Sequence, residues 1–187
     1  MDDGCRSKAD WENPLPPPRG GKGLPASGDF LCVSRADDAV RIEARGLGNM
    51  YLAPSLCTFV EAELQAGFRM FVVDLRHCRG MDSTFMGTFI GLAHKIREKG
   101  GWFGLVNVSP ENLRLLKMLG VVHLVPVHPG DFPLAEGKTT LIFPTGDLQA
   151  RKSQIHSAHL LLMDADTENR NRFGSFIRAL EEEMNGP

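Results

Sequence analysis

The strongest constraint on the fold is the pattern of a buried strand followed closely by the pattern of a helix. Met70–Leu75 is apolar apart from Asp74, which is typical of a strand covered on both faces. From Ser83 to Lys99 the apolar residues recur on one broad helical face, and Gly100 and Gly101 then stop the helix. A strand and a helix in this order favour an α/β fold.

The same alternation extends from Asp29 to about residue 130. The first two predicted strands form a β-hairpin, and Gly46–Gly48 is predicted as a loop. The remaining elements predict strand–helix–strand crossovers, which imply parallel pairing. We therefore expect a mixed, mostly parallel sheet of about five strands with helices packed on it. The predicted strands are Phe30–Ser34, Ala39–Ala44, Met70–Leu75, Trp102–Val106 and Val121–Val127, and the predicted helices are Leu56–Leu64, Ser83–Lys99 and Pro110–Met118.

Two further segments flank this domain. Residues 1–28 are rich in proline and glycine and are predicted to be a disordered tail. Residues 131–187 are predicted to be an extension that begins as a loop with a short strand within Thr139–Phe143. Two helices follow, the second capped by Asp166 or Thr167, and together they predict a helical hairpin against the domain or a partner. The expected parts are thus 1–28, 29–130 and 131–187.

Composition narrows the functional classes. Of the 187 residues 42% are hydrophobic, which is enough for a core, and the net charge of −2 does not suggest a nucleic-acid binder. There is no apolar run of about 18 residues and no apolar signal-peptide core, so we expect no membrane span and a cytoplasmic protein. The four cysteines lack metal-ligand spacing and are expected to be free thiols, mostly buried. No metal or cofactor is expected.

The segment Asp82-Ser83-Thr84 places hydroxyl groups at the start of the strongest helix. Backbone N–H groups and the helix dipole favour negative charge there, so a phosphate on Ser83 would be well placed. Thr84 is a second, weaker candidate. The alternative interpretation is that Asp82 and Ser83 only cap the helix. Local sequence leaves both interpretations open.

The sequence does not favour an enzyme. A nucleophilic Ser83 would need a base, and neither His77 nor His94 has an orienting acid at a telling spacing. His156 and His159 are three residues apart, but without a third ligand they predict an ordinary amphipathic helix. A lone acid at a strand end, such as Asp74, is more often a hydrogen-bond acceptor that stabilises a loop.

Several motifs together resemble the STAS domain of bacterial anti-sigma factor antagonists. The resemblance covers roughly Asp29 to Val127 and adds a likeness of Glu168-Asn169-Arg170 to a tail of some bacterial versions. The matching parts are the early hairpin, Val72-Val73-Asp74-Leu75, Met81-Asp82-Ser83-Thr84, the helix to Lys99, Gly100-Gly101, Leu105-Val106-Asn107-Val108-Ser109-Pro110, and Leu116 to Gly120.

The resemblance implies a regulatory module that is not an enzyme. Ser83, or less favourably Thr84, would accept a phosphate from an anti-sigma factor that is also a serine kinase, and a PP2C-type phosphatase would remove it. The partner would bind at Asp82, Ser83, Thr84, Phe85 and Met86. The alternative is a STAS subunit of a larger assembly, such as a lipid-transport or stress-sensing complex, without phosphorylation.

Overall fold

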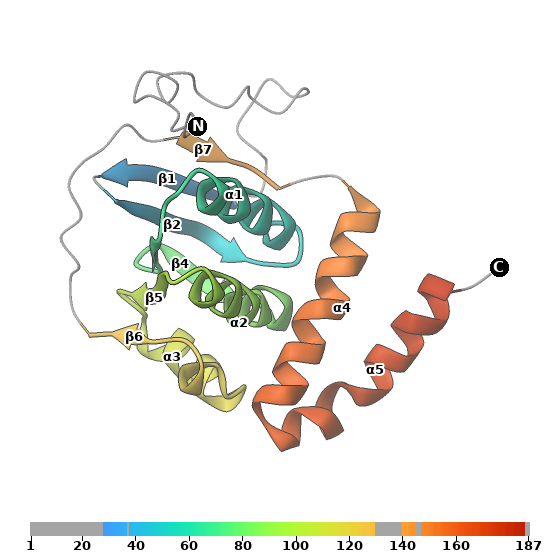
Figure 1. Cartoon of the computed structure of the whole chain (residues 1–187). Helices are drawn as coiled ribbons and strands as arrows, with labels where there is room; N and C mark the ends of the chain where they lie inside the picture. The colour runs from blue at the N-terminus through green and yellow to red at the C-terminus, as the bar shows by residue number, and fades with distance from the viewer. Residues whose placement is uncertain (1–27, 37, 130–139, 145–146, 186–187) are drawn as a thin grey trace.

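The computed structural model describes residues 28–36, 38–129, 140–144 and 147–185 of the chain (Figure 1). The predicted tail, 1–28, therefore lies almost wholly outside the described residues. The strands are β1 (Phe30–Ala36), β2 (Ala39–Gly48), β3 (Met70–Asp74), β4 (Cys78–Met81), β5 (Trp102–Val106), β6 (Val127–His128) and β7 (Thr140–Ile142). The helices are α1 (Ala53–Gln65), α2 (Ser83–Glu98), α3 (Pro110–Met118), α4 (Leu148–Ala165) and α5 (Thr167–Asn185), with a 3₁₀ turn at Val121–His123.

The sheet is mixed and mostly parallel, as the sequence predicted. Its strand order is β6-β5-β3-β2-β1-β7, and β4 pairs with the far end of β2. The pairs β2–β3, β3–β5, β5–β6 and β2–β4 are parallel, whereas β1 is antiparallel to both β2 and β7. The early hairpin and the parallel crossovers are therefore confirmed.

Helices α1 and α2 cover one face of the sheet (Figure 1). Strands β3 and β5 contribute Phe71, Val73 and Leu105 to the core, and α2 contributes Phe85 and Phe89. The rings of Phe85 and Phe89 meet edge to face with centroids 5.0 Å apart. This packing positions α2 on the sheet, and with it the start of the helix at Ser83.

Two details of the sequence prediction are wrong. Gly46–Gly48 is not a loop but the end of β2, because the unforeseen strand β4 pairs with it. The segment Val121–Val127 is not a continuous strand, because Gly120 adopts a left-handed conformation and begins a 3₁₀ turn. Only Val127 and His128 pair with β5. Both errors depend on pairing between segments that are distant in sequence.

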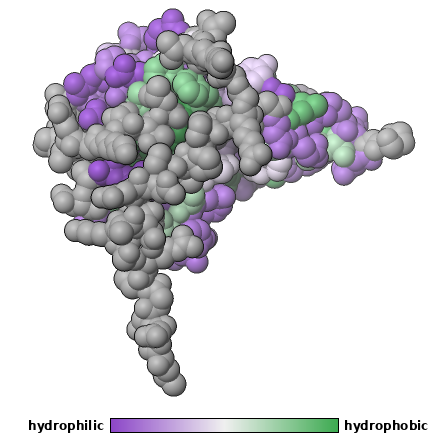
Figure 2. Space-filling view, turned by 90° about the horizontal axis from the view of Figure 1, so that it is seen from above, coloured by the Kyte–Doolittle hydropathy of each residue, from purple (hydrophilic) through white to green (hydrophobic). Residues whose placement is uncertain are grey.

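The C-terminal helices form the predicted hairpin and pack against the domain. Helix α4 lies along α2, and α5 turns back along α4 (Figure 1). Asp166 accepts a hydrogen bond from the N–H of Glu168 at 2.8 Å and so caps α5. An ion pair between Lys152 and Glu183 and a hydrogen bond between His156 and Glu181 link the two helices. Seen from above, the hairpin extends from the body as a largely hydrophilic arm (Figure 2).

None of the helices in the described ranges is long and apolar enough to span a membrane. The short strand expected within Thr139–Phe143 is present as β7.

Candidate functional site

Asp82 is the residue that starts helix α2. Its side chain accepts a hydrogen bond from the N–H of Phe85 at 2.8 Å and another from the N–H of Met50 at 2.8 Å. The first bond caps the helix, and the second ties the cap to the loop between β2 and α1. Burial raises the pKa of Asp82, although these hydrogen bonds act in the opposite direction. The capping role that sequence left open thus belongs to Asp82.

Ser83 is the first residue of α2 and is half-buried. Its Oγ lies 2.8 Å from Nε2 of His159, which comes from α4 and is 76 residues further along the chain. Nδ1 of the same imidazole lies 2.8 Å from the carbonyl oxygen of Ile155, which can only accept. In a neutral His159, Nδ1 is therefore the donor, and Nε2 accepts the hydroxyl proton of Ser83.

The surroundings of His159 favour its neutral form. The residue is 4% exposed, and its ring packs against Phe173 and Phe176 of α5 with centroids 4.8 and 4.9 Å apart. Burial lowers the pKa of His159, while the bond to Ile155 and the charge of Asp82 raise it in part. Helix α5 therefore holds the imidazole, and the imidazole in turn holds the hydroxyl of Ser83.

Close backbone packing surrounds this hydrogen bond. Ser83, Gly87 and Gly91 are four residues apart and share one face of α2. A Cβ added at Gly87 would lie against the carbonyl oxygen of Ala158 and 2.8 Å from its carbonyl carbon. One added at Gly91 would lie 3.1 Å from the end of the Leu161 side chain. This stripe of small residues, Ser83–Gly87–Gly91, is the groove in which α4 lies.

A second polar contact lies beside the groove. Gln154 of α4 donates to the hydroxyl of Thr88 in α2 at 2.9 Å. The thiol of Cys57 in α1 donates to Oε1 of the same Gln154 at 3.3 Å. Burial raises the pKa of Cys57 to about 12. Helix α4 is thus joined to both helices that cover the sheet.

The other predicted partner residues point inward. Thr84, Phe85 and Met86 are 3%, 0% and 3% exposed. Phe85 packs on β2 at Gly48, where an added Cβ would overlap its ring and lie 2.6 Å from Cε1. Their part in binding a partner stays a prediction. In this arrangement Asp82 and Ser83 are less buried than the three residues that follow them.

The remaining candidates do not converge on Ser83. His77 pairs with Glu43 on an exposed turn, and His156 pairs with Glu181. Asp74 accepts a hydrogen bond from the N–H of Arg76 at 2.9 Å and pairs with Arg41, as expected of a loop-stabilising acid. No group of three potential metal ligands occurs among the described residues.

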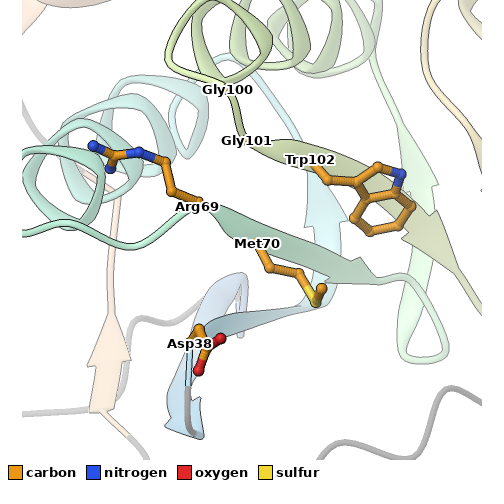
Figure 3. Close-up of a pocket in the computed structure, with 6 residues that line it drawn as sticks. All are labelled: Asp38, Arg69, Met70, Gly100, Gly101 and Trp102. Carbon is orange, nitrogen blue, oxygen red and sulfur yellow. The ribbon is translucent and has the colours of Figure 1, made fainter.

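Two shallow hollows lie away from Ser83. One, of about 280 Å³, is at the amino ends of β3 and β5, whereas Ser83 comes after the carboxyl end of β3 (Figure 3). Figure 3 shows the side chain of Arg69 directed away from Asp38 and Trp102, so these three side chains do not converge on one point of the hollow. The other is lined by His94, Arg97 and Glu98 at the far end of α2.

The sequence pointed to His77 and His94 as the nearest bases for Ser83, but the structure brings His159 to it instead. A serine beside an imidazole is the start of a nucleophile–base arrangement. Here, however, the second ring nitrogen meets the carbonyl of its own helix rather than an acid, and two phenylalanines enclose the ring. The arrangement fixes and covers a hydroxyl. Glycines at four-residue spacing from Ser83 were the sequence signal of this contact.

Fold and site together define a small α/β module that presents a serine at a capped helix start. Residues 36–130 match the STAS domain family, and the chain belongs to that family. In addition, 60 residues are 32% identical to the anti-sigma F factor antagonist of Paenibacillus polymyxa. That match covers 32% of this chain and 51% of the relative, so the chain spans about half the length of the curated relative.

At least one solved structure shares the fold. The protein TM1081 of Thermotoga maritima is 21% identical with a TM-score of 0.50, and the match covers 59% of this chain and 83% of TM1081. The unphosphorylated form of the anti-sigma factor antagonist SpoIIAA of Bacillus is 16% identical with a TM-score of 0.49. That match covers 54% of this chain and 88% of SpoIIAA.

Proposed function

We propose that this chain is an anti-sigma factor antagonist that binds an anti-sigma factor with serine kinase activity and is switched by phosphorylation of Ser83. The main support is the position of Ser83 as the first residue of α2, directly after the capping Asp82, in a STAS domain. The name of the curated relative supports the partner class. Thr84 is the weaker acceptor because its side chain is buried.

The switch is electrostatic. The γ-phosphoryl group of ATP passes to Oγ of Ser83, ADP leaves, and the hydroxyl proton passes to a base of the kinase. The product adds about −1.5 to −2 charges at neutral pH. That charge lies beside Asp82, so the two negative groups are neighbours. Repulsion then disfavours a partner surface that binds the neutral hydroxyl. A PP2C-type phosphatase would restore the binding form.

The proposal is tested with ATP and purified serine-kinase anti-sigma factors: the anti-sigma F factor of Paenibacillus polymyxa and those encoded in the chain's own genome. Peptide mass spectrometry should place one phosphate on Ser83, and Ser83→Ala should remove it, whereas Ser157→Ala on the exposed side of α4 should not. The positive control is the phosphorylation of each kinase's own antagonist. The proposal would be refuted if Ser83 stayed unmodified, beside a phosphorylated control, both in the full chain and in a variant whose α4 is displaced from Ser83.

Binding provides a second test. Wild type and Ser83→Ala should capture the anti-sigma factor, and Ser83→Asp should lose it. Capture of transporter subunits by all three variants alike would instead favour the STAS subunit of a larger assembly.

A further inference from the structure

The face that the proposed function assigns to a partner is occupied by the chain's own C-terminal helix. The groove Ser83–Gly87–Gly91 holds the backbone of α4 at Ala158, and His159 lies directly over the hydroxyl of Ser83. A kinase must bring the γ-phosphate of ATP in line with Oγ of Ser83. With Nε2 of His159 only 2.8 Å away, the direction along that hydrogen bond is closed.

We infer that the α4–α5 hairpin is a displaceable cover of the Ser83 face, so that the hairpin and the anti-sigma factor kinase exclude one another. This inference rests on the proposed function for the identity of the partner. It adds that Ser83 is available only in an open form of the chain, in which α4 has left the groove.

The contacts of α4 are specific enough to close the groove. The interface contains a hydrogen bond at each of two polar positions, Ser83–His159 and Thr88–Gln154. Between them the carbonyl of Ala158 occupies the space that Gly87 leaves free. At the corner of the hairpin, the buried side chain of Asn169 donates to the carbonyl oxygens of Leu119 and Leu162 at 3.1 and 2.8 Å.

Helix α4 buries fewer large apolar side chains than α2 does. Only two apolar side chains of α4, Ala158 and Leu162, are buried, whereas α2 buries Phe85, Phe89, Ile90 and other large side chains. Segments with few buried apolar contacts open at lower free energy than the core. Helices α4 and α5 also lie outside residues 36–130, which match the STAS family. The hairpin is therefore an addition to the domain rather than part of its sheet and covering helices.

Cys57 reports opening without any kinase. Its thiol faces Gln154 of α4, and burial raises its pKa to about 12, so it reacts slowly with iodoacetamide while the hairpin is closed. Displacement of α4 exposes the thiol and returns its pKa towards the ordinary value. Labelling is followed by peptide mass spectrometry, which separates Cys57 from the other cysteines.

The opening variant is Gly87→Ala in the full chain. Alanine favours the helical conformation of α2 by about 1 kcal/mol over glycine, but its Cβ meets the backbone of Ala158. Ala158→Arg opens the groove from the α4 side without changing α2. The matched control is Gly174→Ala in α5, where an added Cβ meets nothing within 4 Å.

We expect both opening variants to raise the labelling rate of Cys57 about tenfold or more, and Ser83 phosphorylation by the same factor, because both reactions draw on one open population. Gly174→Ala should change neither rate. Phosphorylation of wild type and opened variants at the same measurable rate, or labelling unchanged in both opening variants, would overturn the cover. Faster labelling without phosphorylation of any variant would support the cover and refute the proposed function.

Discussion

The hydrogen bond between Ser83 and His159 can be isolated by a double-mutant cycle. The variants are Ser83→Ala, His159→Phe and the double variant. Phenylalanine keeps a ring between Phe173 and Phe176 but removes the acceptor Nε2. Its other effect, loss of the bond to Ile155, is common to both legs of the cycle and cancels.

The expected change in the opening free energy of α4 follows from the burial of His159. Ser83→Ala leaves a nitrogen of a 4% exposed histidine without a donor, which costs about 1–3 kcal/mol with the lost hydrogen bond included. The better helix propensity of alanine returns about 0.5 kcal/mol. We expect a net loss of opening free energy of about 0.5–2.5 kcal/mol in wild type, and a gain of about 0.5 kcal/mol in the His159→Phe background, where only the helix propensity changes. The coupling energy is then about 1–3 kcal/mol.

Hydrogen exchange of the α4 amides is the appropriate assay, because it measures the opening free energy of that helix separately from global unfolding. Urea unfolding of each variant provides the global value. Ser157→Ala, exposed on the same helix, is the control and should destabilise neither, with at most a gain of about 0.5 kcal/mol from helix propensity. A coupling energy below about 0.3 kcal/mol would show that the two side chains do not interact in solution.

Two further predictions concern the same hairpin. Asn169→Ala removes the hydrogen bonds to Leu119 and Leu162 and should lower the opening free energy of α4, measured by hydrogen exchange, by about 2–4 kcal/mol. The control Asn171→Ala, at an exposed position, should lower it by less than about 0.5 kcal/mol. Equal effects of the two variants would contradict the role of Asn169 in anchoring the hairpin. Because burial lowers the pKa of His159, the closed form binds fewer protons than the unfolded chain, so its stability should be complete above about pH 6.5 and decline as the pH falls through that value. Asp82 faces the same imidazole, and burial raises its pKa, so both groups contribute to the pH dependence. Urea midpoints of wild type are therefore compared with those of His159→Phe at each pH. Parallel pH profiles would contradict the assignment of the decline to His159.

Much of the domain was predictable because its signals are local. The helix from Ser83 is confirmed together with its cap, since Asp82 acts through a backbone N–H three residues away. Ser109 likewise caps α3 by accepting from the N–H of Asn112. Continuous apolar runs correctly predicted β3 and β5, because both strands lie inside a sheet with parallel neighbours.

The errors arise where pairing is long-range. The end of β2 is extended only because β4, some 30 residues later, lies beside it. Nothing in the local composition of Gly46–Gly48 distinguishes such a strand end from a loop. The apolar segment after Gly120 satisfied a strand pattern, but the left-handed glycine turns the chain before it can pair.

The candidate site also has one part that depends on neighbouring residues and another that depends on long-range contacts. The sequence by itself determined that Ser83 stands at a capped helix start, because cap, hydroxyl and helix occupy adjacent positions in the chain. Only the tertiary structure decided that His159 covers it. That contact spans 76 residues and depends on two glycines of α2 that let another backbone approach. The sequence shows that glycines leave space on this face of α2, but only the folded structure determines which segment packs there.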